Sequence, residues 1–299
     1  MQKGTISQGA ARGGLIAAMA IFGTIGIFVR GMALPSGVIA LVRGCVGAAF
    51  LLLTMAAQRK RLCLAAIRKS LPLLGLSGAA MGFNWILLFE AYRHTTVATA
   101  TLCYYLAPVL VVLASPLLLR ERLSVRKLLC AFAALAGMAL ASGAQAGGSD
   151  GKLTGILLGL GAAALYACVV LINKRIPTLA ARERTIVQLA VSAAVMLPYT
   201  LAGGLPRAAV FTGKALALLL VVGIVHTGLA YALYFGAIQA LPAQTAAIFS
   251  FIDPVVAILL SAALLGEPLR GLDVAGGLLV LGAAFVCELP EQKPRRRTK

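Results

Sequence analysis

Long apolar runs separated by short basic segments make up almost the whole chain. An apolar run of about 20 residues can cross a hydrocarbon core of about 30 Å as an α-helix. Backbone groups in lipid must pair internally, so only helices or closed barrels span it, and the two-residue alternation of barrel strands is absent. We therefore predict an all-α integral membrane protein with ten transmembrane helices. The predicted spans are residues 13–33, 37–57, 71–91, 96–118, 124–143, 153–173, 185–202, 215–236, 243–264 and 271–288.

The stretch from Ala91 to Ala139 recurs 146 positions later without a gap. Pro108 and Glu121 in the first copy align with Pro254 and Glu267 in the second. Matches of Ala and Leu are common in so apolar a chain, whereas a proline and a glutamate at the same separation in both copies are not. The pattern indicates an internal duplication.

The duplication predicts two repeats of five spans, residues 1–146 and 152–289, followed by a basic tail at 290–299. Because five is odd, consecutive repeats must have opposite orientations in the membrane. Inverted repeats around a site near the middle of the bilayer are typical of alternating-access transporters. A glycine-rich segment at 147–151 marks the boundary between the repeats.

Charge supports this topology. Apolar residues make up 61% of the chain and charged residues 12%, about half the charged fraction of a soluble domain. Of the 27 lysines and arginines, twenty fall on one side of the predicted topology and six on the other, with Arg43 inside a span. The positive-inside rule then places both termini in the cytoplasm. The net charge of +18 lies in these loops and in a tail suited to anionic lipid, so it does not indicate nucleic-acid binding.

The six cysteines have no metal-like spacing, and five of them lie in apolar runs. We expect no disulfide, no metal site and no cofactor. No phosphate-binding loop of the Walker type is present, so ATP is not expected to drive the protein.

The chain resembles the drug/metabolite transporter superfamily, and within it the ten-helix EamA-type permeases. The resemblance covers roughly residues 13–288 and rests on the repeated stretches that begin APVLVVLASPLLLRERL and DPVVAILLSAALLGEPL. Arg120 replaces the usual glycine of the family pattern in the first copy. The resemblance implies an efflux permease with a central cavity lined mainly by spans 1, 3, 4, 6, 8 and 9.

Two ionisable residues inside spans are the main candidates for substrate binding. Asp253 precedes Pro254 and could hold a substrate ammonium or a coupling proton; alternatively, it pairs with a neighbour such as His226. Arg43 could bind a substrate carboxylate with two hydrogen bonds. Its structural alternative is a contact with backbone carbonyls or with Glu90.

Aromatic and polar residues supply further candidates. Trp85 and Tyr231 share the 146-residue offset, and Phe22 and Tyr166 occupy equivalent places in spans 1 and 6. Of the neighbours Tyr104 and Tyr105, only one is expected to face inward on a continuous helix. These rings suit a largely apolar pocket, or else they pack the core or face lipid. Asn84 and Gln188 are buried polar candidates that more often join helices than bind ligands.

The matched prolines and glutamates have architectural explanations. Pro108 and Pro254 could be static kinks or a pair of hinges. Glu121 and Glu267 are expected to cap helix N-termini, with gating as a secondary role.

Together these features predict a bacterial inner-membrane secondary transporter that exports small metabolites, in particular amino acids or their analogues. The alternative substrates are organic cations or drugs, which would use Asp253 and the aromatic residues without Arg43. An intramembrane enzyme is the alternative of another class, but His226 and Asp253 are its only candidate residues and no catalytic serine motif accompanies them.

Overall fold

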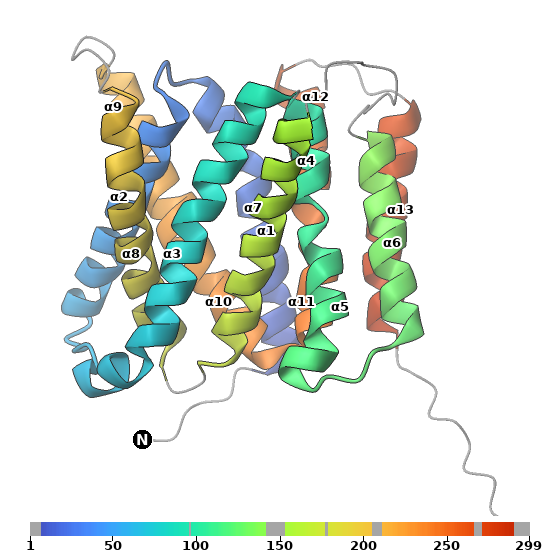
Figure 1. Cartoon of the computed structure of the whole chain (residues 1–299), viewed down its shortest axis with the longest axis horizontal. Coiled ribbons are helices and arrows are strands. Elements are labelled where there is room, and N and C mark those ends of the chain that lie inside the picture. The colour runs from blue at the N-terminus through green and yellow to red at the C-terminus, as the bar shows by residue number, and fades with distance from the viewer. Residues whose placement is uncertain are drawn as a thin grey trace, which may run out of the picture.

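The computed structural model describes residues 7–95, 97–141, 153–176, 179–204, 211–265 and 271–289, all helices, turns and short connections (Figure 1). Helices in the first half are α1 (Gln8–Arg30), α2 (Ser36–Ala57), α3 (Leu64–His94), α4 (Val97–Tyr104), α5 (Ala107–Leu119) and α6 (Val125–Ala141). Those in the second half are α7 (Leu153–Lys174), α8 (Ala181–Ala202), α9 (Gly213–Val221), the π-helix η2 (Val222–Leu229), α10 (Ala230–Ala240), α11 (Ala243–Phe249), α12 (Ile252–Leu265) and α13 (Gly271–Glu288).

Seven helical segments in the described part of the chain are long and apolar enough to cross a membrane. Two shorter apolar helices, Ala107–Leu119 and Val274–Cys287, accompany them. Many large apolar side chains on these helices are exposed, as expected where lipid rather than water surrounds the bundle. The all-helical membrane fold predicted from the apolar runs is therefore confirmed.

Two predicted spans are each broken into two helices. Residues 96–118 form α4 and α5, and residues 243–264 form α11 and α12. The breaks fall at Tyr105 and Leu106 and, 146 positions later, at Phe251 and the preceding Ser250. A second helix starts just before each proline, where the missing N–H is tolerated. The prediction that residues 96–118 and 243–264 each form one continuous helix was therefore wrong in both places.

The two broken helices run in opposite directions. In Figure 1, α4 lies above α5, whereas α12 lies above α11, so the chain descends through the first pair and ascends through the second. Irregular backbone at membrane depth is tolerated where it is enclosed by protein or lines a cavity. Both breaks lie inside the bundle.

Helix packing is symmetric under exchange of the two halves. Helix α1 contacts α10 and α12, and its equivalent α7 contacts α3 and α5. In the same way, α2 contacts η2, and its equivalent α8 contacts α3. The remaining major pairs, α2 with α8 and α6 with α13, join equivalent helices. The arrangement is that expected for two related bundles of helices.

The π-helix η2 keeps the packing of the two halves equivalent although the second half has one more residue in this helix. Contacts of Gly78 and Gly82 with α8 recur as contacts of Gly223 and Gly228 with α2. The first pair is separated by four residues and the second by five, so the second half contains one extra residue in this interval. A π-helix accommodates one extra residue within a continuous helix. Segment η2 therefore keeps both glycines on the face that packs against α2.

Candidate functional site

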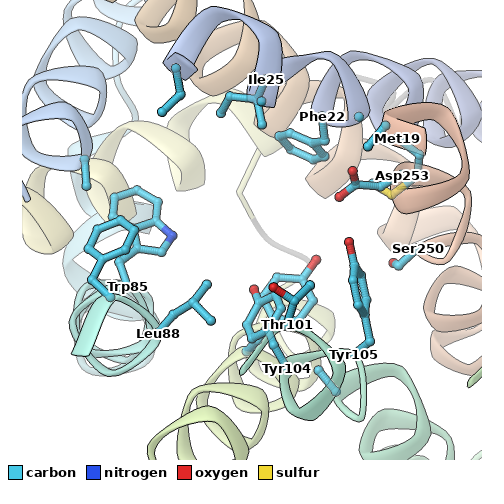
Figure 2. Close-up of a pocket in the computed structure, with 18 of the residues that line it drawn as sticks. Met19, Phe22, Ile25, Trp85, Leu88, Thr101, Tyr104, Tyr105, Ser250 and Asp253 are labelled. Atoms are coloured by element: carbon cyan, nitrogen blue, oxygen red, sulfur yellow. The ribbon is translucent and has the colours of Figure 1, made fainter. Parts of the chain in front are cut away.

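A cavity of about 450 Å³ lies between the two halves of the bundle (Figure 2). Its lining comes from α1, α2, α3, α4, α5, α7, α10 and α12 and from both helix breaks. The resemblance implied the corresponding spans except α2, which contributes Ser36, Ile39, Ala40 and Arg43. Helix breaks and a cavity therefore occupy the same part of the bundle.

The acidic wall of the cavity is formed by Asp253, the second residue of α12. Figure 2 shows its carboxylate at the edge of the cavity beside Phe22. Helix α1 approaches closely here, since a Cβ atom on Gly23 would lie 2.6 Å from the Asp253 carbonyl oxygen. Only glycine allows this contact without displacing one of the helices.

The alternative partner proposed for Asp253 is engaged elsewhere. His226 is buried in η2, and its Nε2 lies 2.7 Å from the Thr24 hydroxyl. That hydroxyl also contacts the Ile21 carbonyl, at 2.7 Å. His226 thus joins η2 to α1 and does not line the cavity.

The basic wall is formed by Arg43, whose guanidinium carbon lies 4.4 Å from the centroid of the Trp85 ring. This is the geometry of a cation–π interaction. The Arg43 Nε atom is buried and makes no hydrogen bond. Glu90 is not its partner, because that carboxylate accepts hydrogen bonds from Tyr199 at 2.7 Å and Arg93 at 3.1 Å.

Acid and base stand on opposite sides of the cavity. Figure 2 shows Asp253 across the opening from Trp85. The Arg43 guanidinium lies against the Trp85 ring and so belongs to the Trp85 side of the cavity. Asp253 belongs to the second half of the chain and Arg43 and Trp85 to the first. A molecule that contacts both charges therefore bridges the two halves.

Aromatic rings form most of the remaining wall. Phe22 packs edge-on against Tyr231 with ring centroids 5.2 Å apart, and the Tyr104 and Tyr166 centroids are 5.7 Å apart. The Tyr166 hydroxyl donates to Tyr234 at 3.0 Å. Predicted residues that line the cavity are Phe22, Arg43, Trp85, Tyr104, Tyr105, Tyr166, Tyr231 and Asp253.

Tyr104 and Tyr105 both line the cavity, contrary to the prediction that only one could face inward. That prediction assumed a continuous helix, on which neighbouring side chains point about 100° apart. Helix α4 ends at Tyr104 and Tyr105 lies in the turn, which frees the second ring to turn inward.

Asn84 and Gln188 bind neighbouring helices outside the cavity lining. Asn84 donates to the Ala162 carbonyl of α7 at 2.6 Å, and Gln188 of α8 donates to Ser77 of α3 at 2.7 Å. Both are therefore placed as interhelical contacts.

Of the predicted hinge and cap residues, the structure describes three. Pro108 lines the cavity, and Pro254 is buried next to Asp253. Glu121 caps a helix, but the helix is α11 of the other half rather than its own successor α6. Glu267 and the tail at 290–299 lie outside the described residues.

Sequence reasoning missed three hydroxyl groups that line the cavity, those of Ser36, Thr101 and Ser250. Ser250 is the repeat equivalent of Tyr104, so the 146-residue offset contained the signal for it. Thr101 is equivalent to Ala247, and no feature of the repeat marks it.

Membrane-length apolar helices around a cavity at two broken helices are the features of a polytopic membrane protein with an internal cavity. A model of the EamA-like transporter family matches residues 13–143 and 153–288. The chain belongs to this family, within the drug/metabolite transporter superfamily, and is a membrane transporter.

Relatives agree with this assignment. An uncharacterized transporter of Bacillus subtilis, YxxF, is 30% identical over 254 residues, which cover 84% of this chain and 81% of the relative. An uncharacterized transporter of Archaeoglobus fulgidus is 28% identical over 213 residues, 68% of this chain and 73% of that one. A solved crystal structure superimposes with a TM-score of 0.83 over 92% of this chain and 96% of that chain. At 20% identity, that structure supports the fold alone.

Proposed function

We propose that the chain is a secondary exporter of amino acids or their analogues in a bacterial inner membrane, with both termini in the cytoplasm. It would consist of two inverted five-helix repeats, residues 1–146 and 152–289, that alternate access to the central cavity. The opposite directions of the broken helices and the symmetric packing support the repeats. The loop charges support the orientation.

The observation that carries the substrate class is the pairing of one acid and one base across an apolar, aromatic cavity. An amino acid presents an ammonium and a carboxylate on one carbon and a side chain that is often apolar. Asp253 would hold the ammonium, the Arg43 guanidinium would hold the carboxylate, and the tyrosines would contact the side chain.

Asp253 is also suited to couple export to the proton gradient. A carboxylate at the cavity wall can hold a proton when the substrate ammonium is absent, and exchanging the two would couple their movement. Export would then need no ATP and would follow the transmembrane proton gradient.

The test is uptake of labelled amino acids into proteoliposomes of the purified chain, with and without an imposed pH gradient. We expect saturable uptake of a group of related amino acids that increases when the pH gradient drives exchange. Each amino acid is paired with the amine that lacks only its carboxylate. Preference for the amino acid supports the proposal.

Organic cations are the second candidate, because Asp253 and the aromatic walls suit them without Arg43. Uptake of amines and drug-like cations with no uptake of amino acids would establish this alternative. Absence of flux for both groups would contradict the proposed function.

A further inference from the structure

In the described part of the chain, the lining of the cavity extends toward one end of the bundle. Its lining extends to Val29 and Ser36, beside the turn between α1 and α2, which lies at the upper end in Figure 1. Toward the lower end, where α5 ends and α11 begins, the lining stops at Pro108. The loop charges predict that this lower end is cytoplasmic.

Polar contacts close the lower end. Both carboxylate oxygens of Glu121 accept from the Ala243 N–H, at 2.8 and 3.1 Å, at the start of α11. Lys174 donates to the Leu241 carbonyl at the end of α10, and its ammonium lies 3.9 Å from Glu121. We name these four residues, Glu121, Lys174, Leu241 and Ala243, the inner latch.

The inner latch joins the two halves of the chain. Glu121 follows α5 in the first half. In the second half, Lys174 ends α7, Leu241 follows α10 and Ala243 begins α11. Its charged side chains are 20% and 15% exposed, so solvent screens their attraction only partly. Each group also meets a helix end of opposite partial charge, the N-terminus of α11 for Glu121 and the C-terminus of α10 for Lys174.

Neighbouring contacts seal the same end. Arg175 donates to the Leu118 carbonyl, and Gln244 donates to Ser115 at 2.8 Å and to the Arg122 carbonyl at 3.2 Å. All of them link the end of α5 or the following loop to the second half. Opening a path from the cavity to this end requires these bonds to separate.

The duplication repeats both charges of the latch. Glu267 corresponds to Glu121 by the 146-residue offset, and Arg30 corresponds to Lys174 by the offset that relates Phe22 to Tyr166. An acid and a base at matched positions of both copies indicate that the pair belongs to the repeated architecture, not to a single loop.

We propose that the inner latch is the cytoplasmic gate: it holds the cavity closed on that side, and its release admits substrate from the cytoplasm. The inference rests on the proposed transport function. Weakening the latch should shift the equilibrium toward a form open to the lower end, because it removes contacts made only in the closed form.

The experiment measures accessibility in proteoliposomes or membrane vesicles of the full chain, with the six native cysteines replaced. One reporter is Ala247→Cys, at a buried position of α11 between the latch and the helix break. The other is Ser36→Cys, at the upper end of the cavity. A maleimide too polar to cross the membrane is applied from each side in turn, and the labelling rates are compared.

Two variants weaken the latch in different ways. Glu121→Gln removes the charge. Ala243→Pro removes the N–H that donates to Glu121. Proline is tolerated at this position, because it is the first residue of α11. The preceding residue, Pro242, has a ψ of 144°, which is compatible with a following proline. Glu183→Gln is the control, since the Glu183 carboxylate accepts hydrogen bonds from the Ala180 N–H at the start of α8 and from the Cys63 N–H, neither of which belongs to the latch.

We expect both latch variants to speed inner labelling of Ala247→Cys and to slow outer labelling of Ser36→Cys. The change should be about fivefold, as for loss of one capping interaction. Unchanged rates in both variants, or an equal shift in the Glu183→Gln control, would overturn the proposal. Labelling needs no transported substrate, so a failed gate and a failed transport function give separate results.

Discussion

The residues that define the site come from distant parts of the chain and differ in how they are held. Arg43 lies over the face of Trp85, and the Trp85 ring is itself buried among α2, α3 and α8. Asp253 is positioned by the first turn of α12 and by the glycine contact with α1. Trp85 therefore acts as a positioning residue for the base, while Asp253 depends on the backbone.

Replacing Trp85 tests this positioning role. Trp85→Leu removes a cation–π interaction of about 1–2 kcal/mol and should raise the KM for a transported amino acid about tenfold. Trp85→Phe keeps an aromatic face and should recover part of the loss. The KM for the matched amine, which has no carboxylate for Arg43, should not change. Equal losses for amino acid and amine would mean that Trp85 only shapes the cavity.

At the level of helices, close contacts depend on glycine. A Cβ atom at Gly78 would lie 2.7 Å from Val191 Cβ, and one at Gly223 would lie 2.5 Å from Val46 Cβ. These matched contacts set the distance of α3 from α8 and of η2 from α2. Small residues allow such packing where no hydrophobic effect drives helices together.

Gly75 and Gly78 of α3 provide a matched pair of substitutions. Gly78→Ala should lower the melting temperature of the purified protein, because α3 and α8 must separate to admit the methyl group. Gly75→Ala meets no atom within 4 Å and should leave the temperature unchanged or raise it, since alanine favours helix by about 1 kcal/mol over glycine. Thermal unfolding in detergent measures both. Equal effects at the two positions would contradict the packing explanation.

Helix locations could be predicted from the apolar runs, but the breaks and the π-helix could not. A proline removes one helical hydrogen bond whether the helix bends or stops. Whether the helix bends or stops at Pro108 and Pro254 depends on the neighbouring helices that enclose the backbone groups left without a helical hydrogen bond. The pattern of apolar residues along the sequence does not show which helices are neighbours. The extra residue between Gly223 and Gly228 changes the repeat offset from 145 to 146, so extending the comparison upstream of Ala237 would have located it.

The site was partly predictable for the same reason. Charged and aromatic residues inside apolar runs are conspicuous, and eight of the ten residues proposed for substrate binding line the cavity. Asn84 and His226 do not, because each satisfies a backbone or hydroxyl group of a neighbouring helix. Helix packing decides whether a polar side chain faces the cavity or joins two helices. The periodicity of the sequence contains no information on this packing.

At the scale of the whole molecule, the cavity lies where the two halves meet. One half supplies the base and the other the acid, so relative movement of the halves would change the distance between Asp253 and Arg43. A substrate that contacts both charges would favour the arrangement in which they are correctly spaced. In the proposed mechanism, this preference would couple substrate binding to the movement that alternating access requires.

The most direct test that Asp253 forms part of the transport site is to measure substrate flux in proteoliposomes for the wild type, Asp253→Asn and Glu90→Gln. Asp253→Asn keeps the size of the side chain and removes the charge at the cavity wall. Glu90→Gln makes the same chemical change on α3, at a carboxylate bonded to Tyr199 outside the cavity lining. We predict that flux is lost in Asp253→Asn and retained in Glu90→Gln. Wild-type flux in Asp253→Asn would contradict the assignment of the transport site to this cavity wall.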